Sequence, residues 1–307
     1  MKIALLAADY ELGRYAHSLS VLEDMEWVGY CLVGGKEPSA GPAALPAGKL
    51  PRSYSSPQQM AGDADLVVVG GRPEQRFDFI SNLLRRGKCV WSDWPLSTAS
   101  AKIRKLAALA EEARVCNQVE HPGRKHPLWL AALPFLERTG IIRTELSDPD
   151  CPGMEQAMDE VLFPCLDRVL SIDGTQVRKV KARKLKTALP EKFSAQVEIE
   201  FCSGLLAEFW MGNVLSDKIG KMRCMTAESV VDLDFVTSEL SLQDTCKGGG
   251  KRKMKVEPCR ESASDAFLTR DLQCFTRACR NGEEGSLNFA ESGRVQEILF
   301  QIRHILL

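Results

Sequence analysis

Four charged or titratable side chains lie close together directly after a short apolar run at 115–119. They are Glu120, His121, Arg124 and His126. An arginine beside histidines can bind an anionic or sugar-like ligand, and His121 could act as an acid or base because histidine titrates near neutral pH. A connecting loop rich in exposed polar groups would show the same pattern. The cluster therefore indicates either a ligand site or a solvated connection.

Two arginines follow an earlier apolar run at 64–70. Arg72 and Arg76 could hold a carboxylate or a phosphate through paired hydrogen bonds. A solvent-facing pair at the start of a helix is an equally good interpretation. Trp91 ends the next apolar run and Trp94 follows it, and both could stack on a ligand or fill the core.

The first turn of the chain has the position of a dinucleotide-binding turn but few of its glycines. In the GxGxxG pattern the glycines permit a tight turn, close approach of the pyrophosphate, and close packing of helix against strand. The sequence over 7–13 reads AADYELG, and only Gly13 remains. Asp9 and Glu11 would repel a nearby phosphate by roughly 1–4 kcal/mol per close pair. The expected contacts to a dinucleotide are Ala7, Asp9, Leu12 and Gly13.

The apolar run at 27–33 ends without an acidic residue. In a dinucleotide-binding domain this strand ends with Asp or Glu, which binds the ribose hydroxyls, or with a basic residue that accommodates a 2′-phosphate. Lys36 is the only candidate here, and it favours NADP over NAD. A lysine in a solvated loop is the alternative interpretation.

The elements that must position these residues alternate between strand and helix over residues 1–119. Strands are expected at the apolar runs 3–7, 27–33, 64–70, 89–91 and 115–119, and helices at 13–23, 73–86 and 99–114. This order predicts a Rossmann-type, doubly wound parallel sheet, an α/β domain. The Pro-, Gly- and Ser-rich segment 34–57 is expected to be mostly irregular.

The pattern changes over residues 120–307. Several predicted strands alternate apolar and polar residues, as 195–201 does, which is typical of a sheet with one exposed face. Helices are expected at 128–139, 155–170, 265–280 and 293–306. These features predict a second, α+β domain with an open, mostly antiparallel sheet. The last helix is expected to pack back on the first domain.

Composition narrows the class of protein. With 307 residues, 26% charged residues and a net charge of −1, the chain gives no electrostatic reason to expect nucleic acid or an anionic membrane as a partner. The basic tract 247–255 is either a solvated hairpin tip or a binding patch. No apolar run is long enough to span a bilayer. The 11 cysteines form no CxxC pair or cluster with metal-ligand spacing, so we expect no metal site and a reducing cytoplasm.

Three segments together resemble one known family. The sequence GKCVWSDWPL over 87–96 resembles the "GkhVlcEKPla" signature of the Gfo/Idh/MocA family. RKHP over 124–127 resembles its "RfxP" element, and DAFLTRDLQCFTRAC over 265–279 resembles its "DxfxxElxxFxxai" helix. The resemblance implies an NAD(P)-dependent oxidoreductase for a sugar-like or small carbonyl substrate, and a homo-oligomer formed through the second sheet.

The resemblance also assigns roles to residues. Relatives carry a Pro-x-x-His close to the nicotinamide ribose, so the resemblance places Gly71, Arg72 and Arg76 near the cofactor, with Arg76 as a departure from that pattern. The substrate contacts expected from the charged cluster after 115–119 are Arg124 and His126.

The catalytic positions implied by the family carry other residues here. The Glu-Lys pair of the signature corresponds to Asp93 and Trp94, and an indole N–H can only donate a hydrogen bond. In the family's "DxGxH" helix, Glu160 replaces the aspartate and Pro164 replaces the histidine, while the later Asp167 remains. Proline cannot transfer a proton, so the family's usual hydride transfer is not expected.

Three classes of function follow. The chain is an NAD(P)-dependent oxidoreductase that uses replacement groups such as His121 or Glu160, a non-catalytic relative that binds a ligand or partner, or an enzyme of non-redox chemistry in the same cleft.

Overall fold

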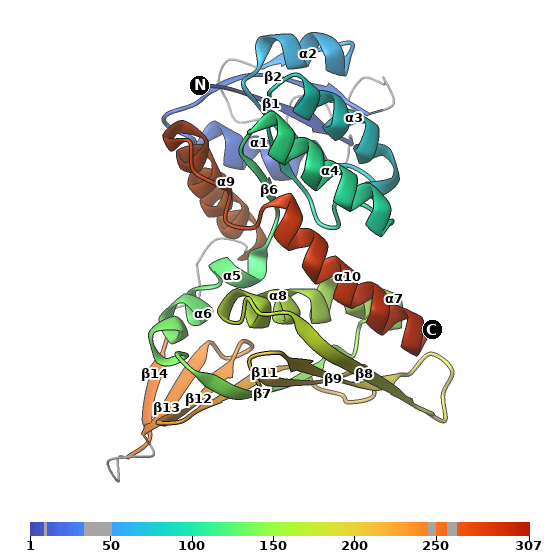
Figure 1. The fold of residues 1–307 in the computed structure, drawn as a ribbon, viewed down its shortest axis with the longest axis vertical. Helices are drawn as coiled ribbons and strands as arrows, with labels where there is room; N and C mark the ends of the chain where they lie inside the picture. The colour runs from blue at the N-terminus through green and yellow to red at the C-terminus, as the bar shows by residue number, and fades with distance from the viewer. Residues whose placement is uncertain (9–10, 34–50, 245–249, 257–262) are drawn as a thin grey trace. The chain divides into compact units, whose positions relative to one another are not determined.

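The computed structural model describes residues 1–8, 11–33, 51–244, 250–256 and 263–307 (Figure 1). The chain divides into two compact units. The first unit consists of Met1–Pro122 and Arg260–Gln296, and the second of Gly123–Cys259 and Glu297–Leu307. The sequence predicts a boundary after residue 119, whereas these units divide after Pro122 and the later segment Arg260–Gln296 belongs to the first unit.

The first unit contains a six-stranded parallel sheet, sheet A, with the order β3-β2-β1-β4-β5-β6. Its strands are β1 (Lys2–Ala7), β2 (Glu26–Leu32), β3 (Arg52–Ser53), β4 (Leu66–Val69), β5 (Cys89–Ser92) and β6 (Asn117–Val119). Its helices are α1 (Leu12–Ser20), α2 (Pro57–Asp63), α3 (Pro73–Arg85), α4 (Ser100–Ala113) and α9 (Ala263–Asn281). This strand order is that of a Rossmann fold, as predicted.

The strands of sheet A are buried on both faces, which explains their continuous apolar sequences. Residues 3–7 of β1 and 66–69 of β4 are at most 1% exposed. Right-handed crossovers place α1 on one face and α3 and α4 on the other, in agreement with Figure 1. Of the segment 34–57, residues 34–50 lie outside the described residues.

Helix α9 packs against α1 and β5 within the first unit. Its Leu268, Leu272 and Phe275 are at most 1% exposed and share one core with Tyr15 and Trp91. This apolar face explains why a segment at the end of the sequence belongs to the first unit. The 18-residue helix α10 (Phe289–Leu306) begins in the first unit and ends in the second.

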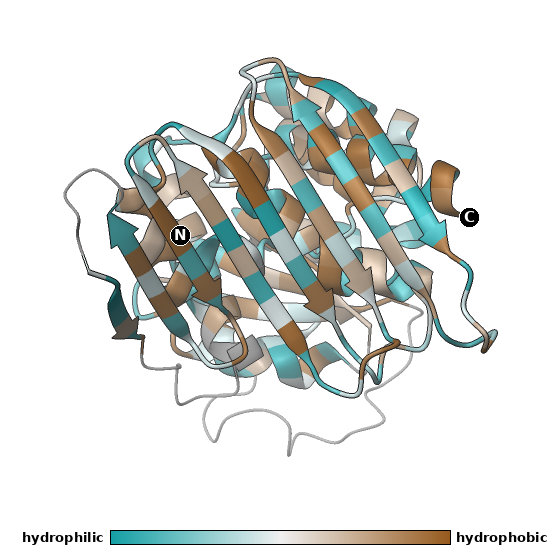
Figure 2. Cartoon of the chain, turned by 90° about the horizontal axis from the view of Figure 1, so that it is seen from below, coloured by the Kyte–Doolittle hydropathy of each residue, from teal (hydrophilic) through white to brown (hydrophobic). Residues whose placement is uncertain are grey.

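The second unit contains an eight-stranded sheet, sheet B, with the order β14-β13-β12-β11-β7-β10-β9-β8. Its strands are β7 (Thr139–Ser147), β8 (Val177–Leu185), β9 (Ser194–Phe201), β10 (Leu206–Gly212), β11 (Ile219–Thr226), β12 (Ser229–Asp234), β13 (Glu239–Asp244) and β14 (Arg252–Lys255). Only β7 and β10 pair in parallel, so the predicted mostly antiparallel sheet is confirmed. Buried and partly exposed residues alternate along β9, and Figure 2 shows the same alternation of hydropathy across the face of the sheet that the helices leave open.

The helical segment expected at 155–170 is divided into three parts. These are α7 (Met154–Ala157), a π-helical turn η4 (Met158–Leu162) and α8 (Phe163–Ile172). Pro164 explains the division, because it lacks an amide hydrogen and its ring would collide with the carbonyl of residue 160 in a continuous α-helix. Widened turns of this kind accommodate such a break.

The remaining short helices follow the first unit's last strand. They are α5 (Pro122–Lys125), α6 (Pro127–Ala132) and the 3₁₀ turn η3 (Leu133–Phe135), in place of the single helix expected at 128–139. No helix in the described part of the chain is long and apolar enough to cross a membrane.

Candidate functional site

Charged side chains gather at the carboxyl edge of sheet A. Because the strands are parallel, the residues that follow β1, β4, β5 and β6 meet at this edge. The contributing residues are Glu11, Arg14, Arg76, Asp93 and Glu120, together with Tyr15 of α1.

Glu11 binds the backbone of its own turn. The Ala8 amide donates a hydrogen bond to Glu11 Oε2 at 3.0 Å, and the backbone of Gly71 donates a second one to the same carboxylate. Burial raises the pKa of Glu11, although both amide hydrogen bonds oppose that shift. The carboxylate therefore occupies amide groups at the turn where a dinucleotide pyrophosphate is expected.

Gly70 makes this close approach possible. A Cβ atom at Gly70 would lie 2.9 Å from Glu11 Oε2 and 3.1 Å from the Tyr15 ring. The sequence pattern drew attention to Glu11 only as a group that repels phosphate. Glu11 is the N-cap residue of α1, but its side chain makes no capping bond with that helix and accepts the earlier Ala8 amide, so no local pattern signals this contact.

Asp93 lies at the centre of the charged group and is 4% exposed. It accepts a hydrogen bond from the Tyr15 hydroxyl, and Arg14 Nη1 lies 3.4 Å from its Oδ1. Burial raises the pKa of Asp93, while Arg76 and Arg14 oppose that rise. Tyr15 is fully buried, and desolvation raises its pKa well above the ordinary value.

Glu120 pairs with Arg14, whose Nη2 donates to its Oε1. Burial, with a smaller contribution from the Asp93 carboxylate, raises the pKa of Glu120 to about 8 despite this arginine. Two carboxylates that share one guanidinium in a desolvated place cannot both ionise readily, so one of them retains a proton near neutral pH.

Arg76 is 4% exposed and binds backbone carbonyls. Its Nε donates to the Gly71 carbonyl at 2.7 Å, its Nη1 to the carbonyls of Asp93 at 2.5 Å and Pro95 at 2.9 Å, and its Nη2 again to Gly71. The guanidinium thus ties the segments after β4 and β5 together. Arg72, in contrast, is exposed at the N-cap of α3 and makes no side-chain capping bond.

His121 lies in the interior of the first unit, fully buried. Its Nδ1 is 3.2 Å from the Val119 carbonyl oxygen and 3.4 Å from Asp271 Oδ1. Asp271, on α9, also accepts hydrogen bonds from Trp91 Nε1 and Gln118 Nε2, both at 2.9 Å. Trp91 is therefore a core residue with a satisfied indole N–H, which decides between the two interpretations of this residue.

The remaining predicted residues of the first unit have different environments. Ala7 and Leu12 are buried, Gly13 is exposed in the first turn of α1, and Trp94 is half-buried after β5. Asp9 and Lys36 lie outside the described residues.

In the second unit, Arg124 and Asp167 form an ion pair with Nε 2.8 Å from Oδ1. The Asp167 side chain is fully buried. Glu160, in the π-helical turn, is exposed and accepts a hydrogen bond from Gln156 at 2.8 Å. Asp167 and Arg124 are thus brought together, whereas Glu160 lies at the surface of its helix.

His126 caps helix α6, since its Nδ1 accepts the Leu128 amide at 3.2 Å. Its ring packs edge-to-face on Phe235 with centroids 5.1 Å apart. Burial, reinforced by the nearby Arg168 charge, lowers the pKa of His126 to about 4. A neutral, capping histidine of this kind carries no charge to offer a substrate at neutral pH.

Arg168 is a buried residue that the sequence did not single out. Its Nε donates to the Gly123 carbonyl at 3.0 Å, and its guanidinium carbon lies 4.1 Å from the centroid of the Phe235 ring. Burial lowers its pKa. Nothing in the sequence marks this arginine, because its contacts come from segments distant along the chain.

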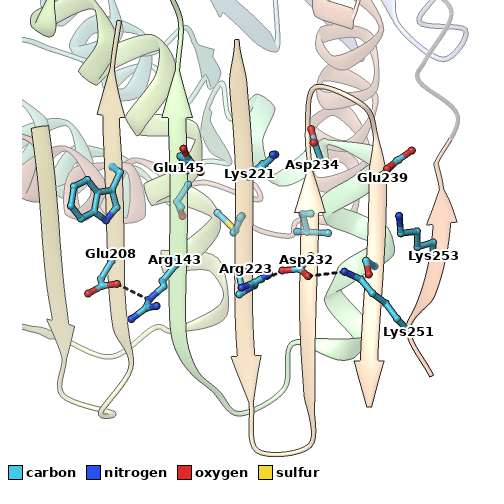
Figure 3. A pocket seen from close by; sticks show the side chains of 15 residues that line it. Arg143, Glu145, Glu208, Lys221, Arg223, Asp232, Asp234, Glu239, Lys251 and Lys253 are labelled. Carbon is cyan, nitrogen blue, oxygen red and sulfur yellow. Dashed lines mark hydrogen bonds and ion pairs between the residues drawn. The ribbon is translucent and has the colours of Figure 1, made fainter. Parts of the chain in front are cut away.

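A hollow of about 790 Å³ lies over the open face of sheet B (Figure 3). Its walls carry charges of both signs. Arg143 Nε lies 2.9 Å from Glu208 Oε2, and Asp232 pairs with Arg223 at 2.5 Å and with Lys251 at 3.7 Å. Trp210, 51% exposed, lies beside them. Within the described ranges, no three His, Cys, Asp or Glu side chains are arranged to hold a metal ion.

Residues 37–121 match a model of an oxidoreductase family with an NAD-binding Rossmann fold, GFO_IDH_MocA. No curated protein matches the sequence significantly. Among solved structures, a UDP-N-acetylglucosamine 3-dehydrogenase from Acidithiobacillus ferrooxidans is 16% identical, with 100% of this chain and 97% of that chain covered and a TM-score of 0.80.

Two further solved structures are similar over nearly their full lengths. An oxidoreductase from Agrobacterium radiobacter in complex with NAD+, L-tartaric acid and magnesium is 13% identical, covering 99% of this chain and 96% of that chain, with a TM-score of 0.81. A biliverdin reductase from Synechocystis sp. PCC 6803, in complex with biliverdin and NADP+, is 18% identical, covering 99% and 98%, with a TM-score of 0.75. These structures share the two-part fold of the chain.

Proposed function

Because residues 37–121 match the Gfo/Idh/MocA oxidoreductase family model, we propose that the chain is a member of this family that retains its scaffold without its hydride transfer. The observation that supports this proposal most directly is the position of Glu11. Its carboxylate accepts the Ala8 amide at 3.0 Å and a second amide from Gly71. A pyrophosphate would have to displace this carboxylate, so the described residues do not fit a bound dinucleotide.

The residues that would handle protons support the same conclusion. Trp94 and Pro164 stand where the family has lysine and histidine, and neither side chain can accept a proton. His121 is fully buried, and Glu160 is an exposed residue that bonds to Gln156. Neither replacement candidate therefore has the accessible and activated setting of an acid or base.

A small molecule that binds this protein is then held without being reduced. The class we expect from the family is a sugar-like or small carbonyl compound, and one similar structure is that of a UDP-N-acetylglucosamine 3-dehydrogenase. Of the expected substrate contacts, Arg124 is engaged with the buried Asp167.

The test is a titration with NADH and NADPH, read as energy transfer from tryptophan to the reduced nicotinamide. We expect no saturable signal below about 1 mM from the natural chain, because the Glu11 carboxylate occupies the turn amide that would bind the pyrophosphate. A dissociation constant of 1 mM corresponds to a binding free energy of only about 4 kcal/mol.

Glu11→Ala frees the turn amides and should increase the affinity for phosphate-bearing ligands. Glu23→Ala, which removes an exposed acid near the end of the same helix, is the matched control. Saturation of the natural chain at micromolar NADH or NADPH would disprove the proposal.

We also propose that the open face of sheet B binds a second copy of the chain. Trp210 is 51% exposed in the middle of this face, and the face carries arginine and lysine beside glutamate and aspartate. A surface with both signs of charge can pair with itself about a two-fold axis.

Light scattering should give the mass of a dimer or larger assembly for the natural chain, and the mass of one chain for Trp210→Arg. Val21→Asp, at an exposed position of the first unit, should leave the mass unchanged, and a monomeric natural chain would refute this assembly.

A further inference from the structure

Three cysteines from separate segments come together at the opposite edge of sheet A from the charged group. Cys89 is the first residue of β5, Cys116 directly precedes β6, and Cys279 lies in the last turns of α9. All three are partly exposed, and all three pack against the core of the first unit. They therefore combine access to solvent with a fixed position.

The strand register places two of these thiols side by side. Val90 is paired with Asn117 in the parallel ladder, and the Val90 amide donates to the Cys116 carbonyl at 3.1 Å. The preceding residues, Cys89 and Cys116, are consequently neighbours at the ends of adjacent strands. Helix α9 packs against β5, its Cys279 lies against the same core as the other two cysteines, and its thiol interacts with both of theirs.

We propose that Cys89 and Cys279 form a peroxide-sensitive thiol pair, which hydrogen peroxide converts to a disulfide between β5 and α9. This modification site is separate from the carboxyl edge of sheet A, and it does not depend on whether a dinucleotide binds there. Cys116 lies beside the pair as a third thiol.

The reaction requires peroxide as the oxidant and proceeds in two balanced steps. The Cys89 thiolate attacks one peroxide oxygen, the O–O bond breaks and hydroxide leaves, so that the sulfur becomes a sulfenic acid. The Cys279 sulfur then attacks the Cys89 sulfur, and the S–O bond breaks as hydroxide leaves with the thiol proton as water. In total, two thiols are oxidised to one disulfide while one peroxide is reduced to two waters.

The environment of the pair assigns the first step to Cys89. The hydrogen bond from Cys279 lowers the pKa of Cys89 to about 7, although burial acts in the opposite direction. Hydrogen bonds to Cys116 and Cys89, together with burial, raise the pKa of Cys279. Cys89 is thus the thiolate near neutral pH, and Cys279 is the thiol that resolves the sulfenic acid.

To test this, the full reduced chain is treated with sub-millimolar hydrogen peroxide and its remaining thiols are alkylated. The peptides are then mapped by mass spectrometry. We expect one peptide pair linked through Cys89 and Cys279, with a loss of about 2 Da for the two thiol hydrogens. Cys202, an exposed cysteine at the end of β9 with no thiol partner among these three, should remain alkylated and serves as the internal reference.

Two variants test the order of the steps. In Cys279→Ser the sulfenic acid at Cys89 should persist and react with a cyclic diketone probe, whereas Cys89→Ser should leave Cys279 unoxidised at the same peroxide concentration. Cys202→Ser should form the disulfide as the natural chain does. Oxidation of Cys89 and Cys279 no faster than that of Cys202, or a linked pair of Cys116 and Cys279 only, would overturn the proposal. The peptide map of the natural chain decides this even if a variant fails to fold.

Discussion

The carboxyl edge of sheet A and the open face of sheet B contain the same kinds of side chain in opposite environments. At the edge, the Arg76 and Asp93 side chains are each 5% exposed. On the open face, Arg143 and Arg223 are 63% and 56% exposed, although each also contacts a carboxylate. Since the same Coulomb attraction is several times stronger where water is excluded, the two groups of charges should differ greatly in their effect on stability.

The difference also bears on function. Buried charges must be hydrogen-bonded and paired, and the Asp93 carboxylate meets this demand within the chain, through hydrogen bonds from Tyr15 and Arg14 and the Arg76 charge 3.9 Å away. Little bonding capacity is then left for a ligand at this edge. The charges over sheet B are exposed, so a partner can engage them at a small cost.

The largest effect is expected from Arg76→Met. The variant removes the donors to the Gly71, Asp93 and Pro95 carbonyls and a positive charge beside a buried carboxylate. We expect the free energy of unfolding in urea to fall by about 3–5 kcal/mol. Arg72→Met, at an exposed position of the same helix, should change it by less than about 0.5 kcal/mol. An effect of Arg76→Met no larger than that of Arg72→Met would contradict the strong stabilisation expected from the buried charges at this edge.

A smaller, pH-dependent effect is expected from Glu120→Gln. The pKa of Glu120 is raised from 4.5 to about 8 on folding, so the folded state binds more protons than the unfolded state between these pH values. The free energy of unfolding therefore decreases as pH rises through this window, and the loss is complete above the folded-state pKa. Glu120→Gln should flatten that decrease in urea denaturation measured across the window. Glu112→Gln, an exposed acid on α4, should keep the slope of the natural chain, and an unchanged slope in Glu120→Gln would refute the assignment.

The smallest effect is expected on sheet B. In a double-mutant cycle of Arg143→Ala and Glu208→Ala, the coupling energy should be about 0.2–1 kcal/mol, as for other exposed pairs. It should decrease further at high salt, because solvent-exposed charges are screened. A coupling energy above about 2 kcal/mol would show that this face is far less accessible to water than the exposure of Arg143 indicates.

Several functional residues could be predicted from the sequence only as candidates. Arg76 is a candidate because it follows a predicted strand, and Asp93 because it stands at the glutamate of the family signature; both belong to the charged group. Whether Arg76 would bind an anion or carbonyl groups could not be read from its position. Glu11 and Arg14 acquire their importance from contacts with Gly71, Asp93 and Glu120, which no local pattern encodes.

The sequence by itself determined the two sheets. A strand of continuous apolar residues such as 3–7 must be covered on both faces of its sheet, whereas an alternating strand such as 195–201 needs cover on one face only. It also determined the absence of lysine at Trp94 and histidine at Pro164. Only the tertiary structure decided which donor meets which acceptor. Periodicity specifies the face on which a side chain lies, whereas the hydrogen bond between Glu11 and the turn amides, or between Trp91 and Asp271 180 residues away, depends on how distant segments approach one another.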